Sequence, residues 1–411
     1  MSKLPEGWKE EQLKNIVDKD RKITYGIVQP GGDISPNGIP LIRGKDYSSG
    51  QINLTGLYHV SEAIDKPYKR SKVKENDILL TIVGYVGQTA IVPKELENAN
   101  ITQTTARISV NPTIADYKYI DYFLNSFLGQ KNLKKYEKGS AQAGLNLKDI
   151  EKVKIYLAPL EEQKKIAEIL STVDQKIAFV DNQIEETELL KKGLMQKLLT
   201  EGIGHTEFKD SELGRIPVEW EVVKLKNLSE KISDGIHTTP KYTNESKYYF
   251  INGNNLNDGK IEYGEKTKQV SYEEYIKHKK DLNENTVLLS INGTIGNTAF
   301  YNNEHIVLGK SAAYIICNDL INKYFLRYLL SSAYIKKYFE LELTGTTIRN
   351  LSIKTIKNTK IGLPPLQEQK QIAEILSTAD EKLENLKAKK ESFEELKKGL
   401  MQKLLTGEVR V

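Results

Sequence analysis

The sequence of 411 residues predicts an α+β protein in which two pseudo-symmetric α/β domains are separated by two long antiparallel coiled-coil helices. Three observations predict this fold class. One block of sequence recurs almost unchanged, apolar residues follow heptad spacing through both of its copies, and short apolar runs alternate with glycine turns and helical segments elsewhere. Hairpins mixed with helices favour α+β over a doubly wound parallel sheet.

The repeat is closest in two segments. The fourteen residues that begin at Pro159 recur from Pro365, and the eleven that begin at Leu190 recur from Leu396, both at an offset of 206 residues. An unchanged register over about forty residues indicates that length is constrained there.

The rest of the chain repeats more loosely, and what recurs is glycines and apolar residues. Polar positions differ between the copies: Arg43 and Asp46 stand where the second copy has Asn252 and Asn255. Two recognition modules with different targets would show this pattern, and so would a duplicated domain whose surface has drifted.

The recurring block predicts two long helices. Apolar residues step by four and three from Ile166 to Leu198 and from Ile372 to Leu404. Forty residues make a helix of about 60 Å, and such helices rarely stand alone in water, so we expect them to pair with each other. A twofold relation makes the pair antiparallel, with the domains at opposite ends. Packing of each helix on its own domain or on a foreign protein is the alternative. Three lysines interrupt the apolar seam and predict looser packing or burial against another surface there: Lys191, Lys390 and Lys397.

Shorter elements are predicted in both domains. In the first, the pattern predicts strands over 40–43, 77–83, 89–92 and 107–110 and helices over 114–125 and 129–138. In the second, it predicts strands over 249–252, 286–291, 298–301 and 313–316 and helices over 322–331 and 333–340. Paired glycines predict hairpin turns at 84–87 and 293–296.

The predicted organisation has five parts: a first domain over 1–158, a first long helix over 159–200, a linker over 201–217, a second domain over 218–363, and a second long helix with a C-terminal tail over 364–411.

Composition excludes several classes of protein. Hydrophobic residues make up 39% of the chain and charged residues 28%, and no apolar run is long enough to span a membrane. The N-terminus lacks an apolar core of signal-peptide length, so we expect a cytoplasmic protein. A single cysteine, Cys317, excludes internal disulfides, and the five histidines lie too far apart for the usual metal-ligand spacings.

The net charge of +5 is mild, but residues 1–158 carry 23 Lys and Arg against 18 Asp and Glu. Lysine and arginine hold phosphates or guanine edges, and amides pair with adenine. A solvated face is the commoner meaning of any one such cluster. The DNA-contact candidates are polar and aromatic residues expected to be exposed: Arg43, Lys45, Tyr47, Lys69, Arg70, Lys72, Tyr85, Gln88 and Gln103 in the first domain, and His237, Lys241, Asn252, Asn254, Asn255, Lys279, Lys280, Asn292 and Lys310 in the second.

No catalytic signature stands out. Gly309-Lys310-Ser311 resembles the end of a nucleotide-binding loop, but Glu304 occupies the place of its first glycine. The pairs Glu162-Gln163 and Glu368-Gln369 echo a nuclease motif only superficially, because they begin helices. Their recurrence indicates a structural or partner-contact role, and we assign them to partner binding. The chain is predicted to bind and not to catalyse.

The order of domain, long helix, domain, long helix resembles the DNA-specificity subunit of type I restriction–modification systems. The residues that carry the resemblance are the repeated Pro-Leu-x-Glu-Gln-x-x-Ile-Ala-x-x-Leu-x-x-x-Asp over Pro159–Asp174 and Pro365–Asp380, the repeated Leu-Lys-Lys-Gly-Leu-Met-Gln-Lys-Leu-Leu-Thr, and Gly-Ile-His-Thr-Thr-Pro over Gly235–Pro240. The first domain departs from the last motif at 26–30, which limits transfer of base contacts between the halves.

The resemblance implies that residues 1–158 and 218–363 are target recognition domains, each of which reads one half of a split site in double-stranded DNA. It implies that the helices set the spacer between half-sites. The implied partners are two methylation subunits and the restriction subunits. S-adenosylmethionine, ATP and magnesium would belong to those subunits, and no cofactor to this chain.

Two other hypotheses stay open from the residues alone. One is an autonomous regulator that reads a split operator. Tight specific DNA binding by the isolated chain would support it. The other is a coiled-coil scaffold that binds only proteins, against which a steep fall of DNA affinity with salt would count.

Overall fold

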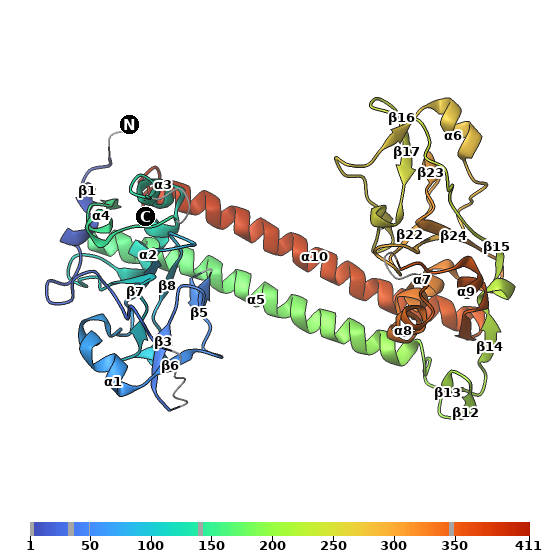
Figure 1. The fold of residues 1–411 in the computed structure, drawn as a ribbon, viewed down its shortest axis with the longest axis horizontal. Coiled ribbons are helices and arrows are strands. Elements are labelled where there is room, and N and C mark those ends of the chain that lie inside the picture. The colour runs from blue at the N-terminus through green and yellow to red at the C-terminus, as the bar shows by residue number, and fades with distance from the viewer. Residues whose placement is uncertain (1–3, 32–36, 49, 139–142, 345–348) are drawn as a thin grey trace. The chain divides into compact units, whose positions relative to one another are not determined.

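We analysed a computed structural model that describes residues 4–31, 37–48, 50–138, 143–344 and 349–411. The chain divides into two compact units, Met1–Asn182 with Ala388–Val411, and Gln183–Lys387. Each long helix contributes to both units: α5 spans Leu160–Leu198 and α10 spans Leu366–Leu404. The mixture of helices and small sheets confirms the predicted α+β class (Figure 1).

The first unit is built on a four-stranded sheet ordered β2-β10-β7-β8. Its strands are antiparallel neighbours, and α2 contacts β8. In a second sheet, ordered β6-β3-β9, β3 is antiparallel to β6 and parallel to β9. The bounds are β2 Thr24–Tyr25, β3 Ile39–Ile42, β6 Tyr58–Val60, β7 Ile78–Thr81, β8 Thr89–Ile91, β9 Asn100–Ile101 and β10 Thr105–Ile108.

Helices and two strand pairs complete the first unit. The helices are α1 Glu62–Asp65, α2 Tyr117–Asn125, α3 Phe127–Lys134 and α4 Leu147–Glu151, and a 3-10 helix, η2, spans Lys66–Ser71. β1 (Lys9–Gln12) pairs with β11 (Lys154–Leu157), the strand that leads into α5, and β4 (Tyr47–Ser48) pairs with β5 (Gln51–Ile52). The side chains of Asp116 and Ser126 accept hydrogen bonds from backbone N–H groups of α2 and α3, so caps explain where these helices begin.

The second unit repeats this plan, and its smaller sheet has one strand more. Its main sheet is ordered β15-β24-β21-β22, and the smaller one β16-β20-β17-β23. The bounds are β14 Glu221–Lys224, β15 Ser229–Asp234, β16 Tyr242–Thr243, β17 Tyr248–Ile251, β20 Gln269–Val270, β21 Thr286–Ser290, β22 Thr298–Phe300, β23 Ile306–Leu308, β24 Ala312–Cys317 and β25 Lys360–Leu363, with helices α6 Tyr272–His278, α7 Lys323–Ser331, α8 Ala333–Leu341 and α9 Ile353–Asn358.

Most predicted strands and helices are confirmed to within a few residues. The short pairing strands, such as β1, β2 and β9, were not predicted, because two to four residues show no clear alternation. The linker expected over 201–217 is partly wrong: β12 (Phe208–Ser211) and β13 (Gly214–Pro217) form a hairpin there, and Ile216 of that hairpin is buried in the same core as Trp220.

The recurring glycines have a steric reason. A Cβ on Gly26 would lie 1.7 Å from the carbonyl oxygen of Ile101, and one on Gly235 would lie 2.1 Å from that of Leu308. Both predicted hairpin turns are confirmed, since β7–β8 and β21–β22 are antiparallel neighbours and Gly84, Gly87, Gly293 and Gly296 all adopt positive φ.

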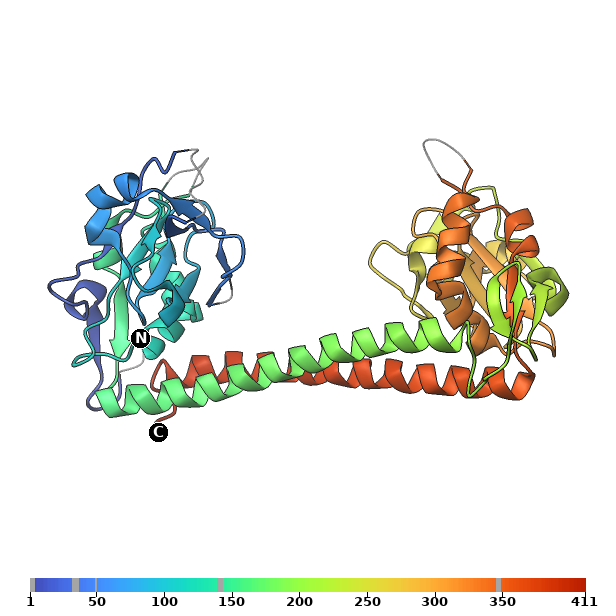
Figure 2. The ribbon, with the colours of Figure 1, turned by 90° about the horizontal axis from the view of Figure 1, so that it is seen from below.

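The long helices pack side by side within each unit (Figure 2). In the first, Ile166 and Leu170 of α5 share a core with Leu404 of α10; in the second, Leu198 shares one with Ile372 and Leu376. These pairings place the start of one helix beside the end of the other, as an antiparallel pair requires.

Candidate nucleic-acid interface

The repeated Glu-Gln pair fastens each long helix to its own domain. Gln163 Nε2 donates to the carbonyl oxygen of Ala158 at 2.8 Å, and its Oε1 accepts from the N–H of Asp116 at 2.9 Å. Gln369 makes the equivalent bonds to the carbonyl of Pro364 at 2.9 Å and the N–H of Asn322 at 2.8 Å.

The glutamates bind a tryptophan indole. Trp8 donates to Glu162 at 3.1 Å, and Trp220 donates to Glu368 at 3.1 Å. A basic side chain completes each site, Arg410 beside Glu162 and His205 beside Glu368. Although burial raises it, the pKa of Glu162 is lowered overall by Arg410 and Trp8.

These bonds favour the structural role for the four residues, and their assignment to partner binding stays a prediction. Gln163 and Gln369 are fully buried, and Glu162 and Glu368 are largely so. Side chains whose polar atoms bond inside the chain present little surface to a partner. The recurrence at fixed spacing reflects two equivalent attachments of domain to helix.

A second repeated site links each domain to both long helices. Tyr122 of α2 donates to Asp174 of α5 at 2.7 Å, and Lys397 of α10 lies 2.6 Å from the same carboxylate. In the other unit Tyr328 donates to Asp380 at 2.7 Å, and Lys191 pairs with that carboxylate.

The lysines that interrupt the heptad seam thus make interhelical ion pairs, and Lys390 does the same with Asp181 at 2.7 Å. At these positions a pair of complementary charges replaces an apolar contact and can select one register of the two helices, and looser packing there stays a prediction. Each unit contains one complete Tyr–Asp–Lys site.

The turn after β3 illustrates how the two domains share a backbone and differ in chemistry. Asp46 accepts from the N–H of Arg43 at 2.8 Å, and Asn255 accepts from the N–H of Asn252 at 3.0 Å. In the first domain Asp46 also binds the Arg43 guanidinium, and this hydrogen bond is the largest influence that raises the pKa of Arg43. The second domain has amides at both positions.

Most remaining candidates lie at the surface. In the first domain Lys45, Tyr85, Gln88 and Gln103 are exposed; in the second, His237, Lys241, Asn254, Lys279 and Lys310 are exposed, and Asn292 and Lys280 are half-buried. Tyr85 is 81% exposed at the tip of the β7–β8 hairpin.

Two candidates expected at the surface are buried, and those expectations are corrected. Tyr47 is 3% exposed, with its hydroxyl donating to Thr105 at 3.3 Å. Asn255 is 8% exposed, and its amide donates to the carbonyl of Glu262 and the hydroxyl of Thr267. Both side chains hold loops together from inside.

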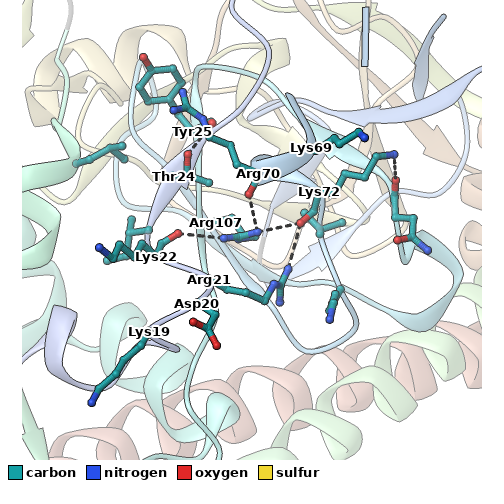
Figure 3. Close-up of a pocket in the computed structure, with 15 residues that line it drawn as sticks. Lys19, Asp20, Arg21, Lys22, Thr24, Tyr25, Lys69, Arg70, Lys72 and Arg107 are labelled. Atoms are coloured by element: carbon teal, nitrogen blue, oxygen red, sulfur yellow. Dashed lines mark hydrogen bonds between the residues drawn. The ribbon is translucent and has the colours of Figure 1, made fainter. Parts of the chain in front are cut away.

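Three candidates come together in one place, a groove of about 710 Å³ that we call the basic groove (Figure 3). Residues 19–25, the end of η2 and β10 form its walls. One carboxylate, Asp20, lines it together with eight cations: Lys19, Arg21, Lys22, Lys69, Arg70, Lys72, Lys74 and Arg107.

Some of these cations are held by carboxylates of the domain. Arg21 binds Asp77 through two bonds of 2.8 and 2.7 Å, and Lys72 pairs with Asp65 at 2.9 Å. Others, including Lys22 and Lys69, are exposed at the rim. Lys74 was also expected to be an exposed cation, so four of the eight were not predicted, although the run from Lys19 to Lys22 and a lone arginine, Arg107, in an apolar strand were visible signals.

Within the described ranges, no group of three or more His, Cys, Asp or Glu side chains is arranged to hold a metal ion. The same ranges contain no helix that is both long and apolar enough to cross a membrane.

Comparison with known proteins identifies the class. Residues 5–189 and 217–395 match the family described as the type I restriction modification DNA specificity domain. The chain belongs to this family, whose members are non-catalytic DNA-recognition subunits of type I restriction–modification systems.

Two relatives from Methanocaldococcus jannaschii are similar over most of their length. The putative type I restriction enzyme MjaX specificity subunit is 32% identical, with 100% of this chain and 96% of the relative aligned. The type I restriction enzyme MjaVIII specificity subunit is 35% identical over 82% of this chain and 80% of its own.

Solved structures show the same fold. The S subunit of a type I restriction–modification system from M. genitalium aligns with a TM-score of 0.59 and 17% identity over 98% of this chain and 97% of its own. A structure described under complex assembly and conformational transition of the type I R-M system gives a TM-score of 0.63 and 18% identity, with both chains fully covered.

Proposed function

We propose that this specificity subunit binds a bipartite sequence in double-stranded DNA, one half-site per domain, and directs methylation and restriction subunits to that sequence in the cytoplasm. The observation that carries the proposal is the shared turn with divergent chemistry. Arg43 in one domain and Asn252 in the other begin the same hydrogen-bonded turn, and both residues are half-buried, whereas Asn255 is held inside its loop. Guanidinium and amide groups prefer different base edges, so two such domains would read different half-sites.

In this proposal the long helices set the spacer. Support comes from the equal length of α5 and α10, 39 residues each, and from the matched Tyr–Asp–Lys sites that attach both domains to both helices. A polar pair at one position of a coiled coil selects one register of the two helices. A fixed register is needed if the helices are to hold the two domains at a defined separation.

Exposed apolar residues on the long helices support docking of two copies of one partner. Leu190 of α5 and Leu396 of α10 occupy equivalent positions of the repeat, and both are about half exposed. Phe179 and Leu189 are also exposed. Large apolar side chains exposed on a helix are typical of interaction sites. One equivalent site in each unit fits two methylation subunits, which would bring S-adenosylmethionine, while ATP and magnesium would belong to the restriction subunits.

The test is a map of methylated adenines. The full chain is co-expressed with the methylation subunit of its host in cells that lack other methyltransferases, and the genome is read by long-read sequencing. We expect methylation at one split sequence with a fixed spacer. The matched control expresses the methylation subunit alone and should leave that sequence unmodified. Methylation spread over unrelated sequences would contradict the proposal. So would a chain that represses transcription at one specific sequence while no methylation occurs there.

A further inference from the structure

The floor of the basic groove contains a buried arginine that forms no ion pair with a carboxylate of the described residues. Arg107 is 3% exposed and donates to the carbonyl oxygens of Lys22 at 3.0 Å, Arg70 at 2.9 Å and Lys72 at 3.0 Å (Figure 3). Among the described residues no carboxylate oxygen lies within 4.0 Å of its guanidinium, and its buried Nε has no hydrogen-bond partner. Burial of a charge without an ion-pair partner is costly, so this arrangement calls for an explanation.

Asp77 and Asp18 attract the Arg107 guanidinium from beyond ion-pair distance, and Asp77 is already bonded to other groups. Asp77 accepts two bonds from Arg21, one from the hydroxyl of Ser109 at 2.6 Å and one from the N–H of Lys74 at 2.7 Å. Burial, and then the positive charge of Arg21, lower the pKa of Arg107 to about 10, which leaves it cationic at neutral pH. Arg107 is thus a buried positive charge, and seven further cations line the same groove.

The other unit shows how this fold treats a buried arginine that needs no ligand. Arg327 is also buried and also leaves its Nε without a partner. Two carboxylates pair with it, Asp258 and, at 3.1 Å, Asp380. Ion pairing inside the chain is therefore available to this protein, and Arg107 lacks it.

We propose that the basic groove binds phosphate groups of the DNA backbone next to the half-site of the first domain, and that these phosphates add negative charge beside Arg107, which has no ion-pair partner of its own. This inference rests on the proposed function and assigns it a second contact surface, separate from the polar turn that reads bases. Lysines hold phosphates as point charges and carry little sequence information, so the groove would position the duplex and not specify bases.

The second domain has no arginine at the position equivalent to Arg107. Strand register places Tyr314 of β24 where β10 has Arg107, since the two residues face Leu288 and Leu79 of matching strands. Tyr314 is buried as well but carries no charge. The two half-sites should therefore differ in how much of their binding depends on salt.

The experiment uses the full chain assembled with the methylation subunits and compares Lys22→Gln/Lys69→Gln with the wild type. Both lysines are exposed, so the fold should not depend on them. Affinity for a duplex with the mapped sequence and for an unrelated duplex is measured from 50 to 300 mM salt. Each lost phosphate contact lowers the slope of log affinity against log salt by about one. We expect a slope smaller by about two, and an affinity at 100 mM salt lower by about tenfold on both duplexes.

The control is Lys14→Gln/Lys94→Gln, which removes two exposed lysines of the same domain outside the groove and should leave slope and affinity unchanged. Equal slopes for all three proteins would overturn the inference. A second result would also overturn it: inorganic phosphate binds the wild type but not the groove variant, while the salt slope for DNA is the same for both proteins. The groove would then be a site for free phosphate and not for DNA. Failure of the wild-type complex to prefer any sequence would contradict the proposed function instead.

Discussion

Lys397 of α10 lies 2.6 Å from Asp174 of α5, and the residues at the equivalent positions of the other repeat, Lys191 of α5 and Asp380 of α10, also pair. The same two positions of the repeat therefore meet twice, with the helices exchanged. An effect measured on this ion pair in one unit can therefore be checked on the equivalent pair in the other unit.

The first prediction concerns that ion pair. In a double-mutant cycle with Asp174→Asn and Lys397→Met, we expect a coupling of about 1 kcal/mol, since both side chains are partly shielded and Tyr122 holds the carboxylate in place. Hydrogen exchange of the α5 amides reports the local opening free energy. The exposed pair Glu161–Lys164 on the same helix serves as control and should couple more weakly, because water screens both charges. Equal coupling for the two pairs would show that Asp174–Lys397 plays no special part.

The second prediction concerns the domain–helix attachment. Gln163→Ala leaves the N–H of Asp116 and the carbonyl of Ala158 buried without partners, so we expect a loss of about 2 kcal/mol in the stability of the first unit. Gln369→Ala should cost a similar amount in the second unit. Gln196→Ala, at an exposed position of α5, is the matched control and should change stability by less than about 0.5 kcal/mol. Denaturation followed by hydrogen exchange measures all three, and a Gln163 variant as stable as the control would refute the assigned role.

The third prediction concerns pH. Burial raises the pKa of Asp121 in α2 to about 6, despite a hydrogen bond from Thr89. The folded state then binds this proton more tightly than the unfolded state does. Stability of the first unit should therefore fall as pH rises from about 4 to about 6, by at most about 3 kcal/mol, and stay level above that.

Asp121→Asn removes the titrating group and should abolish that part of the slope. Hydrogen exchange of the α2 amides between pH 4 and pH 8 measures it, after correction for the intrinsic exchange rate. The α7 amides of the second unit, where Arg327 occupies the equivalent position, are an internal control that the substitution should not affect. A slope that survives in the variant would place its origin elsewhere.

The fourth prediction concerns the exposed leucines. Leu190→Glu and Leu396→Glu should each weaken binding of one methylation subunit by about tenfold or more, because a charge at an apolar contact is left without a partner. Native mass spectrometry should then show one copy bound for either single variant and none for the double variant. Leu320→Glu, at another exposed leucine, is the control. Two copies bound to the double variant would exclude these positions from the docking sites.

Much of the fold could be predicted because it depends on regular patterns. Heptad spacing predicted both long helices, and runs such as those at β7 and β21 are buried apolar strands. Short strands without alternation, such as β2 and β9, form only because neighbouring strands supply their partners, and a single sequence does not show which segments meet.

The site was harder to predict for a related reason. Lys69, Arg70 and Lys72 were found by residue type, but the groove depends on residues 19–25 and β10, which are distant in sequence. Exposure was misjudged where a polar side chain bonds inward, as for Tyr47, Asn255 and Gln163. Hydrogen-bond partners decide such cases, and they become visible only in three dimensions.

The spacing role of the helices can be tested most directly by removing one heptad from each, residues 178–184 of α5 and 384–390 of α10. The deletions lie between the two Tyr–Asp–Lys sites, keep both of them, and remove Asp181 together with its partner Lys390. Seven residues correspond to about 10 Å of helix, or about three base pairs along DNA. With the methylation subunit present, the map of methylated adenines should show both half-sites unchanged and a spacer shorter by about three base pairs. A folded variant that methylates the original sequence with its original spacer would contradict the account.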